Sequence, residues 1–190
     1  MVLTTVFLTV GLAILLPIFI ITKNDVIEVI TITVGVTLYH FAMRLAVGYT
    51  VNFVMKNKAN HNNAWFREKS FENKLYKLIG VRKWKKYLPT YSPDTFDTEK
   101  RTVEEIIGAT CQAEIVHEII MILSLLPITL IPSLGSAPAF VITSVLSMLF
   151  DSMFVILQRF NRPKFVKIMK RFRKLTPTDT NKSPSPQNNS

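Results

Sequence analysis

The chain has 190 residues, of which 48% are hydrophobic, and its mean hydropathy is +0.27. This composition is too apolar for a soluble domain of that length, so we expect a membrane protein. One cysteine and three histidines exclude an intramolecular disulfide, a zinc site of the usual kind and a His-rich metal cluster. The formal net charge of +10 follows from the membrane topology argued below, so nucleic acid is not needed as a partner.

Four apolar blocks lie at about 2–22, 26–55, 106–131 and 137–157. Each is long enough to cross a bilayer core about 30 Å thick. They predict an all-α integral membrane protein with four transmembrane helices in a single domain over residues 1–174, followed by a disordered polar tail at 175–190. No Lys or Arg precedes the first block and no small-x-small cleavage site follows it, so we expect a retained helix and not a signal peptide.

The basic residues are distributed unevenly along the chain. Of the 23 Lys and Arg residues, 11 lie between Lys56 and Lys100 and nine between Arg159 and Lys182. The connection before the second block contains only Lys23, and the connection at 132–136 contains none. By the positive-inside rule, the sequence predicts a multi-pass protein of the cell membrane with both termini in the cytoplasm.

Two basic segments have the pattern of helices that lie on a membrane surface. In "AWFREKSFENKLYKLIGVRKWKKYLPTY", within an interfacial loop at 56–101, apolar residues recur at helical spacing among lysines, and Gly80 can end the helix. The expected interfacial anchors are Trp65, Trp84, Tyr87 and Tyr91. "PKFVKIMKRFRK" predicts a second interfacial helix at 163–174. For the loop, a binding surface for an anionic group is the alternative.

Polar residues recur at helical spacing inside the second block. Thr33, Thr37, His40, Arg44 and Gly48 follow at intervals of three or four and therefore share one face of a helix. An Arg near the centre of a membrane costs about 2.5–3.5 kcal/mol even on insertion scales, so this face must contact protein or water.

The third block carries a second polar face. "TVEE" at 102–105 has capping-box spacing, so the helix should start near Thr102. Glu114 and His117 are then one turn apart, and Glu118 lies one turn beyond Glu114. A polar face on each of two helices predicts a pocket between them, in the cytoplasmic half of the bilayer.

Two interpretations of this pocket are open. In the structural one, Arg44 forms a buried ion pair with Glu114 or Glu118, and the histidines fill space. In the functional one, the His117 imidazole takes a proton near neutral pH while a carboxylate one turn away holds its tautomer. Cys111 lacks a neighbouring cation in the sequence, which argues against a cysteine nucleophile. Direct transfer of an activated carbonyl or phosphoryl group to a hydroxyl is the reaction class that this predicts.

Three segments also resemble a known family. "FREKSFENKLYKLIGVRKWKKYLP", "CQAEIVHEI" and "VILQRFNRPKFVKIMKRFRK" are similar to the signature regions of the glycosyl-diaponeurosporenoate acyltransferase family, membrane enzymes that esterify the sugar of a carotenoid glycoside. The resemblance covers about 65–174. The matched polar positions are Arg82, Lys83, Trp84, Lys85, Glu114, His117, Gln158, Arg159, Asn161, Arg162 and Pro163.

The resemblance implies a membrane O-acyltransferase that moves a fatty acyl group from a thioester to a hydroxyl of a lipophilic, glycosylated acceptor. His117 would be the general base and Glu114 its orienting partner, with His40 as a third catalytic candidate. The expected substrate-binding residues are Arg44, Arg82, Trp84, Lys85, Glu118, Gln158, Arg159, Asn161 and Arg162.

The expected donor is acyl-coenzyme A or an acyl carrier protein thioester, with no metal and no cofactor. Membrane lipids and the acceptor glycoside complete the partners, and the sequence leaves open whether the chain forms a homo-oligomer. Two other interpretations use the same residues. One is a non-catalytic protein that binds or transports an anionic lipid or glycolipid, and the other is an accessory subunit in which the polar faces only pair.

Overall fold

Four long helices dominate the computed structural model, which describes residues 1–88 and 101–175. They are α1 (Val2–Thr22), α2 (Asp25–Met55), α5 (Val103–Leu123) and α7 (Ala137–Leu175). Four helical stretches are long and apolar enough to cross a membrane, and the described residues contain helices and no strand. The predicted all-α fold with four spans is confirmed. Tyr91 and residues 176–190 of the tail predicted at 175–190 lie outside the described residues, and Leu175 is the last residue of α7.

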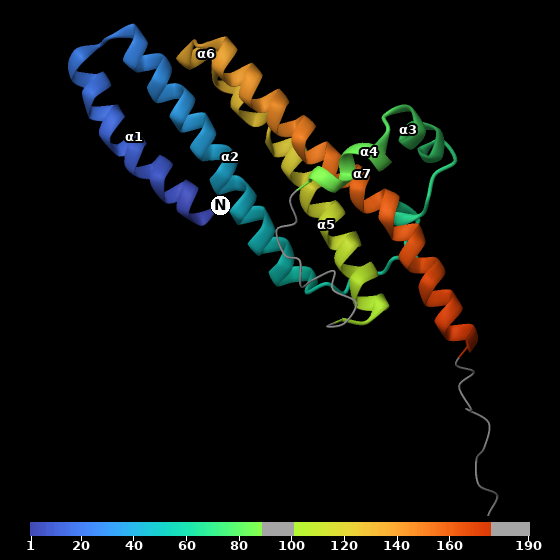
Figure 1. Ribbon diagram of the computed structural model, residues 1–190. Helices are drawn as coiled ribbons and strands as arrows, with labels where there is room; N and C mark the ends of the chain where they lie inside the picture. Colours follow the sequence, from blue (N-terminus) through green and yellow to red (C-terminus); the bar gives the residue numbers. More distant parts are fainter. Residues whose placement is uncertain (89–100, 176–190) are drawn as a thin grey trace, which may run out of the picture.

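The helices pack as two pairs. α1 packs against α2, α5 packs against α7, and α2 also contacts both α5 and α7 (Figure 1). α1 lies at the edge of the bundle and has no buried residue, as expected for a helix whose apolar side chains face lipid. The functional candidates of the sequence therefore gather among α2, α5 and α7.

An apolar interface joins α2 to α5. Met43, Val47 and Val51 follow one face of α2 and pack with Ile120 of α5. The Tyr39 hydroxyl donates a 2.8 Å hydrogen bond to the carbonyl oxygen of Leu123, at the end of α5. This bond satisfies one of the carbonyl groups that a helix C-terminus leaves without an intrahelical partner.

Side-chain caps fix where two of the helices begin. The Asn24 side chain accepts hydrogen bonds from the amides of Val26 and Ile27 at the start of α2. Thr102 and Glu105 form the predicted capping box at the start of α5. The third helix therefore begins at Val103, three residues before the apolar block that predicted it.

The third membrane segment is not one straight helix. α5 ends at Leu123, and the short helices η4 (Leu126–Leu130) and α6 (Ile131–Leu134) follow it. Pro127 and Pro132 lie near the starts of these two short helices. Each proline lacks an N–H and disfavours helical conformation in the residue before it, which explains why α5 does not continue.

The fourth helix is longer than predicted. α7 runs for 39 residues and passes through Pro163, so the separate interfacial helix expected at 163–174 is instead the C-terminal part of α7. A 39-residue helix is about 58 Å long at 1.5 Å per residue, well beyond the thickness of a bilayer core. Pro163 removes one backbone hydrogen bond, and the helix continues past it.

The connection between α2 and α5 folds back along α7 through η1 (Ala64–Phe66), α3 (Glu72–Leu78), α4 (Val81–Trp84) and η2 (Lys85–Tyr87) (Figure 1). Gly80 has a φ of +62° between α3 and α4, the left-handed conformation that ends the predicted helix there. α3 buries Glu72 and Tyr76 but leaves Phe71 and Leu78 exposed, Leu78 by 84%. An outward apolar face of this kind suits a helix in the headgroup layer. We call the end of the bundle that carries this connection the basic end.

Candidate functional site

The buried face of α7 is largely polar. Ser144, Ser147, Asp151, Gln158 and Arg162 are buried and follow one another at helical spacing, whereas Leu146 and Leu149 on other faces are exposed. A membrane helix with polar residues inside and apolar residues outside must satisfy its polar groups against neighbouring helices. α5 and α2 provide these partners in two separate clusters.

The first cluster is an ion-pair network around Glu114, which is fully buried on α5. Its carboxylate accepts a 2.5 Å hydrogen bond from Nη1 of Arg159 and a second hydrogen bond from Nη2 of Arg162. Arg159 also donates to Oε1 of Glu72 from Nε at 2.9 Å and from Nη2 at 2.7 Å. Two carboxylates therefore balance the charges of two guanidinium groups.

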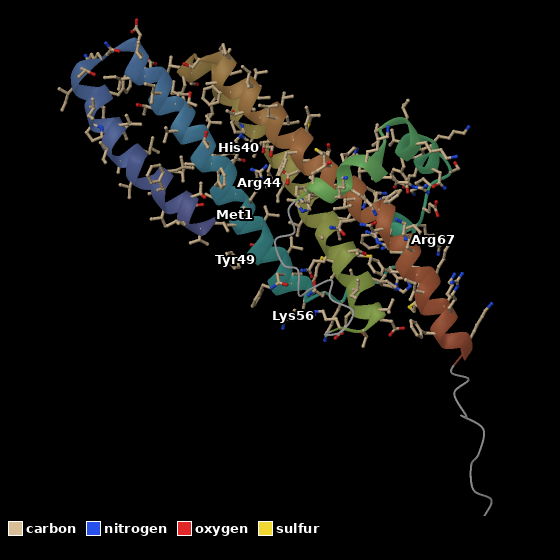
Figure 2. All side chains as sticks on the ribbon, viewed as in Figure 1. Met1, His40, Arg44, Tyr49, Lys56 and Arg67 are labelled. Carbon is tan, nitrogen blue, oxygen red and sulfur yellow. The ribbon has the colours of Figure 1, made fainter. Side chains whose placement is uncertain are left out.

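Backbone carbonyls use the remaining donors of these arginines. Arg162 donates to the carbonyl oxygens of Phe66 and Thr110, and Arg159 donates to those of Trp65 and Arg67. The labelled Arg67 lies beside α7 in Figure 2. The network thus fastens the segment before α3 to α5 and α7.

Tyr76 completes this network on α3. Its hydroxyl donates a 2.9 Å hydrogen bond to Oε2 of Glu72, and both residues are buried. Burial, followed by the hydrogen bond to the Glu72 carboxylate, raises the pKa of Tyr76 above its ordinary value. The hydroxyl therefore stays protonated at neutral pH and remains a donor to Glu72.

The second cluster is a His–Asp–Arg chain, made of His117, Asp151 and Arg44 from three helices. Nδ1 of His117 is 2.9 Å from Oδ1 of Asp151, and Nη2 of Arg44 is 2.5 Å from Oδ2 of the same carboxylate. Arg44 also donates a 2.7 Å hydrogen bond to Oγ of Ser147. Asp151 is 1% exposed, so its charge is balanced by Arg44 and not by water.

These contacts correct two expectations from the sequence. Glu114 does not pair with His117, because both of its oxygens are bound by Arg159 and Arg162. Arg44 does not pair with Glu114 or Glu118, because it reaches across to α7 instead. Glu114 and His117 lie one turn apart on α5, but they bind different residues of α7.

Sequence reasoning missed Asp151. It is the only acidic residue of α7, and it lies in an otherwise apolar stretch at 137–157. An ionisable residue in such a stretch is a functional candidate by itself, so this signal was available.

The environment of His117 leaves one ring nitrogen available. Its ring stacks on Phe154, with ring centroids 4.6 Å apart and planes 10° apart. Its side chain is 22% exposed, and Nε2 has no hydrogen-bond partner among the described residues. With Nδ1–H donating to Asp151, Nε2 carries the lone pair, which is the arrangement of the base in a Ser-His-Asp triad.

The other predicted polar residues of the bundle lie apart from this chain. Oε2 of Glu118 accepts a 3.0 Å hydrogen bond from Nε1 of Trp65, and both residues line a cavity of about 400 Å³ beside η1. Gln158 is buried on α7, and Asn161 is half-buried one helical turn from it. His40 is buried between α2 and α7, one turn from Arg44.

A group of cations gathers on the outer side of α7 at the basic end. The ammonium groups of Lys85 and Lys164 lie 5.2 Å and 3.9 Å from the centre of the Phe160 ring. Arg82 is near enough to interact electrostatically with Lys164. Among the described residues, none of these three cations has an ion-pair partner. Trp84, by contrast, donates to the carbonyl of Ile79 and holds the turn between α3 and α4.

The fold and the two clusters define a multi-pass membrane protein with an Asp–His pair inside its helical bundle. A family model described as glycosyl-4,4′-diaponeurosporenoate acyltransferase matches residues 62–171, which is 110 of the 190 residues. The chain therefore belongs to this family and is an acyltransferase. No curated protein and no solved structure matches it.

The matched region contains the ion-pair network, the exposed cations, His117 and Asp151. His40 and Arg44 precede it. The family supports an acyltransferase of carotenoid glycosides, as the resemblance implied.

Proposed function

We propose that the protein transfers a fatty acyl group from a thioester to a hydroxyl of a lipophilic, glycosylated acceptor at the cytoplasmic leaflet. The observation that carries this proposal is the pairing of His117 with Asp151, which leaves Nε2 free in a chain that belongs to an acyltransferase family. The donor and the leaflet rest on other features, namely the cations near Phe160 and the distribution of basic residues in the fold.

The proposed reaction needs one base and no covalent enzyme intermediate. Nε2 of His117 takes the proton of the acceptor hydroxyl as the oxygen attacks the thioester carbonyl. The tetrahedral intermediate then expels the thiolate, which receives the same proton from the imidazolium. Asp151 stabilises that imidazolium, and the hydrogen bond from Arg44 holds the carboxylate in its orientation.

The ion-pair network is a poor candidate for the donor site. Arg159 and Arg162 were expected to bind the donor, but their charges are already balanced by Glu72 and Glu114. A phosphate would have to displace a buried carboxylate and leave it without a partner, which costs several kcal/mol. We assign the network to holding the connection on α7.

Arg82, Lys85 and Lys164 are the better candidates for the donor site. Lys164 lies close enough to Lys85 and Arg82 to be repelled by both, and none of the three has an ion-pair partner among the described residues, so a bound anion relieves that repulsion. Lys164 lies 13 residues from Asp151 on α7, which is about 20 Å along the helix. In coenzyme A and in acyl carrier protein, the extended pantetheine arm separates the thioester from the phosphate. We therefore propose that this cluster binds the donor phosphate or the acidic face of the carrier.

The cytoplasmic leaflet is supported by where the basic residues lie in the fold. The connection after α2 and the C-terminal part of α7 share the basic end, while the α1–α2 and α6–α7 turns share the other end (Figure 1). The basic end is then the cytoplasmic one by the positive-inside rule. Coenzyme A and acyl carrier proteins are available on that side.

Replacement of the base tests the reaction. In nanodiscs with radiolabelled palmitoyl-coenzyme A and a glycosylated carotenoid acid, His117→Ala should lower kcat by roughly 10²- to 10⁴-fold, the usual contribution of a general base. The Arg44–Asp151 pair survives this change, so the melting temperature should stay close to that of the wild type. His61→Gln, in the connection after α2, is the matched control. Activity of His117→Ala within a few-fold of wild type would show that the base assignment is wrong.

Neutralising two of the three cations near Phe160 tests the donor site. Lys85→Ser and Lys164→Ser together should raise KM for the acyl donor at least tenfold, or about 1.4 kcal/mol of binding free energy, and should weaken its salt dependence. Lys77→Ser, on the exposed side of α3, is the control for removal of one surface charge. If the double variant keeps the wild-type donor KM, the donor binds elsewhere.

A further inference from the structure

His40 is the most unusual buried group of the described residues. It is 4% exposed, and neither ring nitrogen has a hydrogen-bond partner in the part of the chain that the structure describes. A neutral imidazole has one N–H donor and one acceptor, and a buried polar group left unsatisfied costs about 1–3 kcal/mol. Oγ of Ser144 on α7 is also buried without a partner among the described residues. Unsatisfied groups of this kind indicate a ligand or ordered solvent that belongs beside them.

A cavity of about 430 Å³ lies next to His40, between α2 and α7. Figure 2 shows His40 and Arg44 on the side of α2 that faces α7. The cavity is lined mainly by Thr37, His40, Arg44, Thr143, Ser147 and Phe150. Four of its seven lining residues carry a hydroxyl group or an imidazole, at a depth where the outward faces of the helices are apolar.

The charge balance of this cavity favours an uncharged ligand over an anionic one. Arg44 is its only ionised lining residue, and the Asp151 carboxylate already balances that charge. An anionic headgroup would find no unpaired cation there. Hydroxyl groups both donate and accept hydrogen bonds, so a polyhydroxylated, uncharged group matches the imidazole and the serine and threonine side chains.

The rim of the cavity is apolar and can accommodate an apolar tail attached to the polar head of the ligand. Leu146 and Phe150 line it, and both are largely exposed on the outer surface of α7. In a membrane these side chains face acyl chains, so an apolar tail attached to the polar head can remain in the lipid. The site fits a glycolipid-like molecule that enters between α2 and α7.

The cavity adjoins the His–Asp–Arg chain. Arg44 and Ser147 line the cavity and are hydrogen-bonded to each other, and Arg44 also binds Asp151. Phe150 packs edge-on against Phe154, whose ring stacks on His117. A ligand in the cavity therefore lies one layer of side chains from the proposed base.

We propose that this cavity binds the sugar of the acceptor, and that His40 is an acceptor-binding residue whose ring nitrogens hydrogen-bond the hydroxyl groups of the sugar beside Thr37 and Thr143. This proposal rests on the proposed function. It gives His40 a binding role in place of the catalytic role that the sequence suggested. The ligand class is an uncharged glycoside with a long apolar tail.

Binding and kinetics together test the proposal. The probe is tritiated dodecyl glucoside, measured with His117→Ala protein in nanodiscs, so that turnover does not interfere. Adding His40→Leu should weaken binding at least tenfold, whereas His40→Asn, which keeps a donor and an acceptor, should restore most of it. In the otherwise wild-type enzyme, His40→Leu should raise KM for the acceptor and leave KM for the acyl donor unchanged.

Competition with unlabelled amphiphiles identifies the polar headgroup that the cavity prefers. Unlabelled dodecyl glucoside should displace the probe, whereas dodecanol and dodecyl phosphate should not. Displacement by the phosphate as well as by the glucoside would overturn the assignment to an uncharged head. Thr37→Val, which removes a hydroxyl group from the wall of the cavity, is a second variant with an expected smaller loss of binding, in case His40→Leu does not fold.

Failure of this proposal is distinguishable from failure of the proposed function. Unchanged glucoside binding in both His40→Leu and Thr37→Val, with acyl transfer still dependent on His117, would overturn the cavity alone. Loss of glucoside binding in His40→Leu, with full activity in His117→Ala, would support the cavity and overturn the assigned base.

Discussion

At the scale of single residues, the partners of a buried carboxylate indicate whether it contributes to stability or to catalysis. Glu114 and Asp151 are both buried carboxylates within the bundle, and both bind arginine. Glu114 has two arginines and no contact with a group able to take a proton, whereas Asp151 shares its oxygens between Arg44 and His117. We therefore expect Glu114 to contribute to stability and Asp151 to catalysis.

Double-mutant cycles distinguish these pairings. Glu114→Gln leaves the guanidinium groups of Arg159 and Arg162 with one carboxylate, that of Glu72, in place of two, so it should lower the free energy of unfolding by about 3–5 kcal/mol. Coupling between Glu114→Gln and Arg162→Met should reach about 1–3 kcal/mol, whereas Glu114→Gln and Arg44→Met should be additive within about 0.5 kcal/mol, because they share no partner. Unfolding in detergent, monitored by circular dichroism, measures the stability change and both coupling energies.

The contrary result has a definite meaning. Strong coupling between Arg44 and Glu114 would support the accessory-subunit interpretation, in which the two polar stripes only pair with each other. It would also contradict the contact of Arg44 with Asp151 on α7.

At the scale of helices, close approach at the basic end depends on one glycine. A Cβ at Gly108 of α5 would lie 2.2 Å from the carbonyl oxygen of Asn57, in the turn after α2. Gln112, one turn further along α5, accepts a 2.7 Å hydrogen bond from the Asn57 amide. The turn therefore packs directly on the backbone of α5.

Gly108→Ala should destabilise the protein by about 1–3 kcal/mol, because backbone and not a flexible side chain must move. Gly48→Ala in α2 is the matched control, since its added Cβ would have nothing within 4 Å. That change should be neutral or stabilising by up to about 1 kcal/mol, the usual gain for Gly to Ala inside a helix. Thermal unfolding in detergent compares the two, and equal effects would argue against the close contact.

At the scale of the whole molecule, the orientation in the membrane decides which substrates reach the site. The exposed cations, the cavity beside Glu118 and the C-terminal part of α7 are all at the basic end. If this end faces the cytoplasm, a soluble acyl donor reaches the cations directly while a lipophilic acceptor arrives through the bilayer.

Cysteine accessibility tests that orientation. In a Cys111→Ala background, a membrane-impermeant maleimide should label Asn24→Cys on intact cells and should label Asn62→Cys only in inverted vesicles. Asn24 caps α2 at one end of the bundle, and Asn62 lies in the connection after α2 at the other. Labelling of Asn62→Cys on intact cells would place the basic end outside and remove the cytoplasmic donor from the proposal.

The four apolar helices, the capped start of α5 and the turn at Gly80 after α3 could be predicted from the sequence, because hydrophobic length and capping chemistry are local properties. The presence of polar side chains within the apolar blocks was equally evident. Their partners follow from the packing of the helices: His117 meets Asp151, Glu114 meets two arginines, and Arg44 meets α7. These contacts join residues 34 to 107 positions apart, and they depend on how α2, α5 and α7 are rotated and shifted against one another. The spacing of residues along one helix carries no information about that packing.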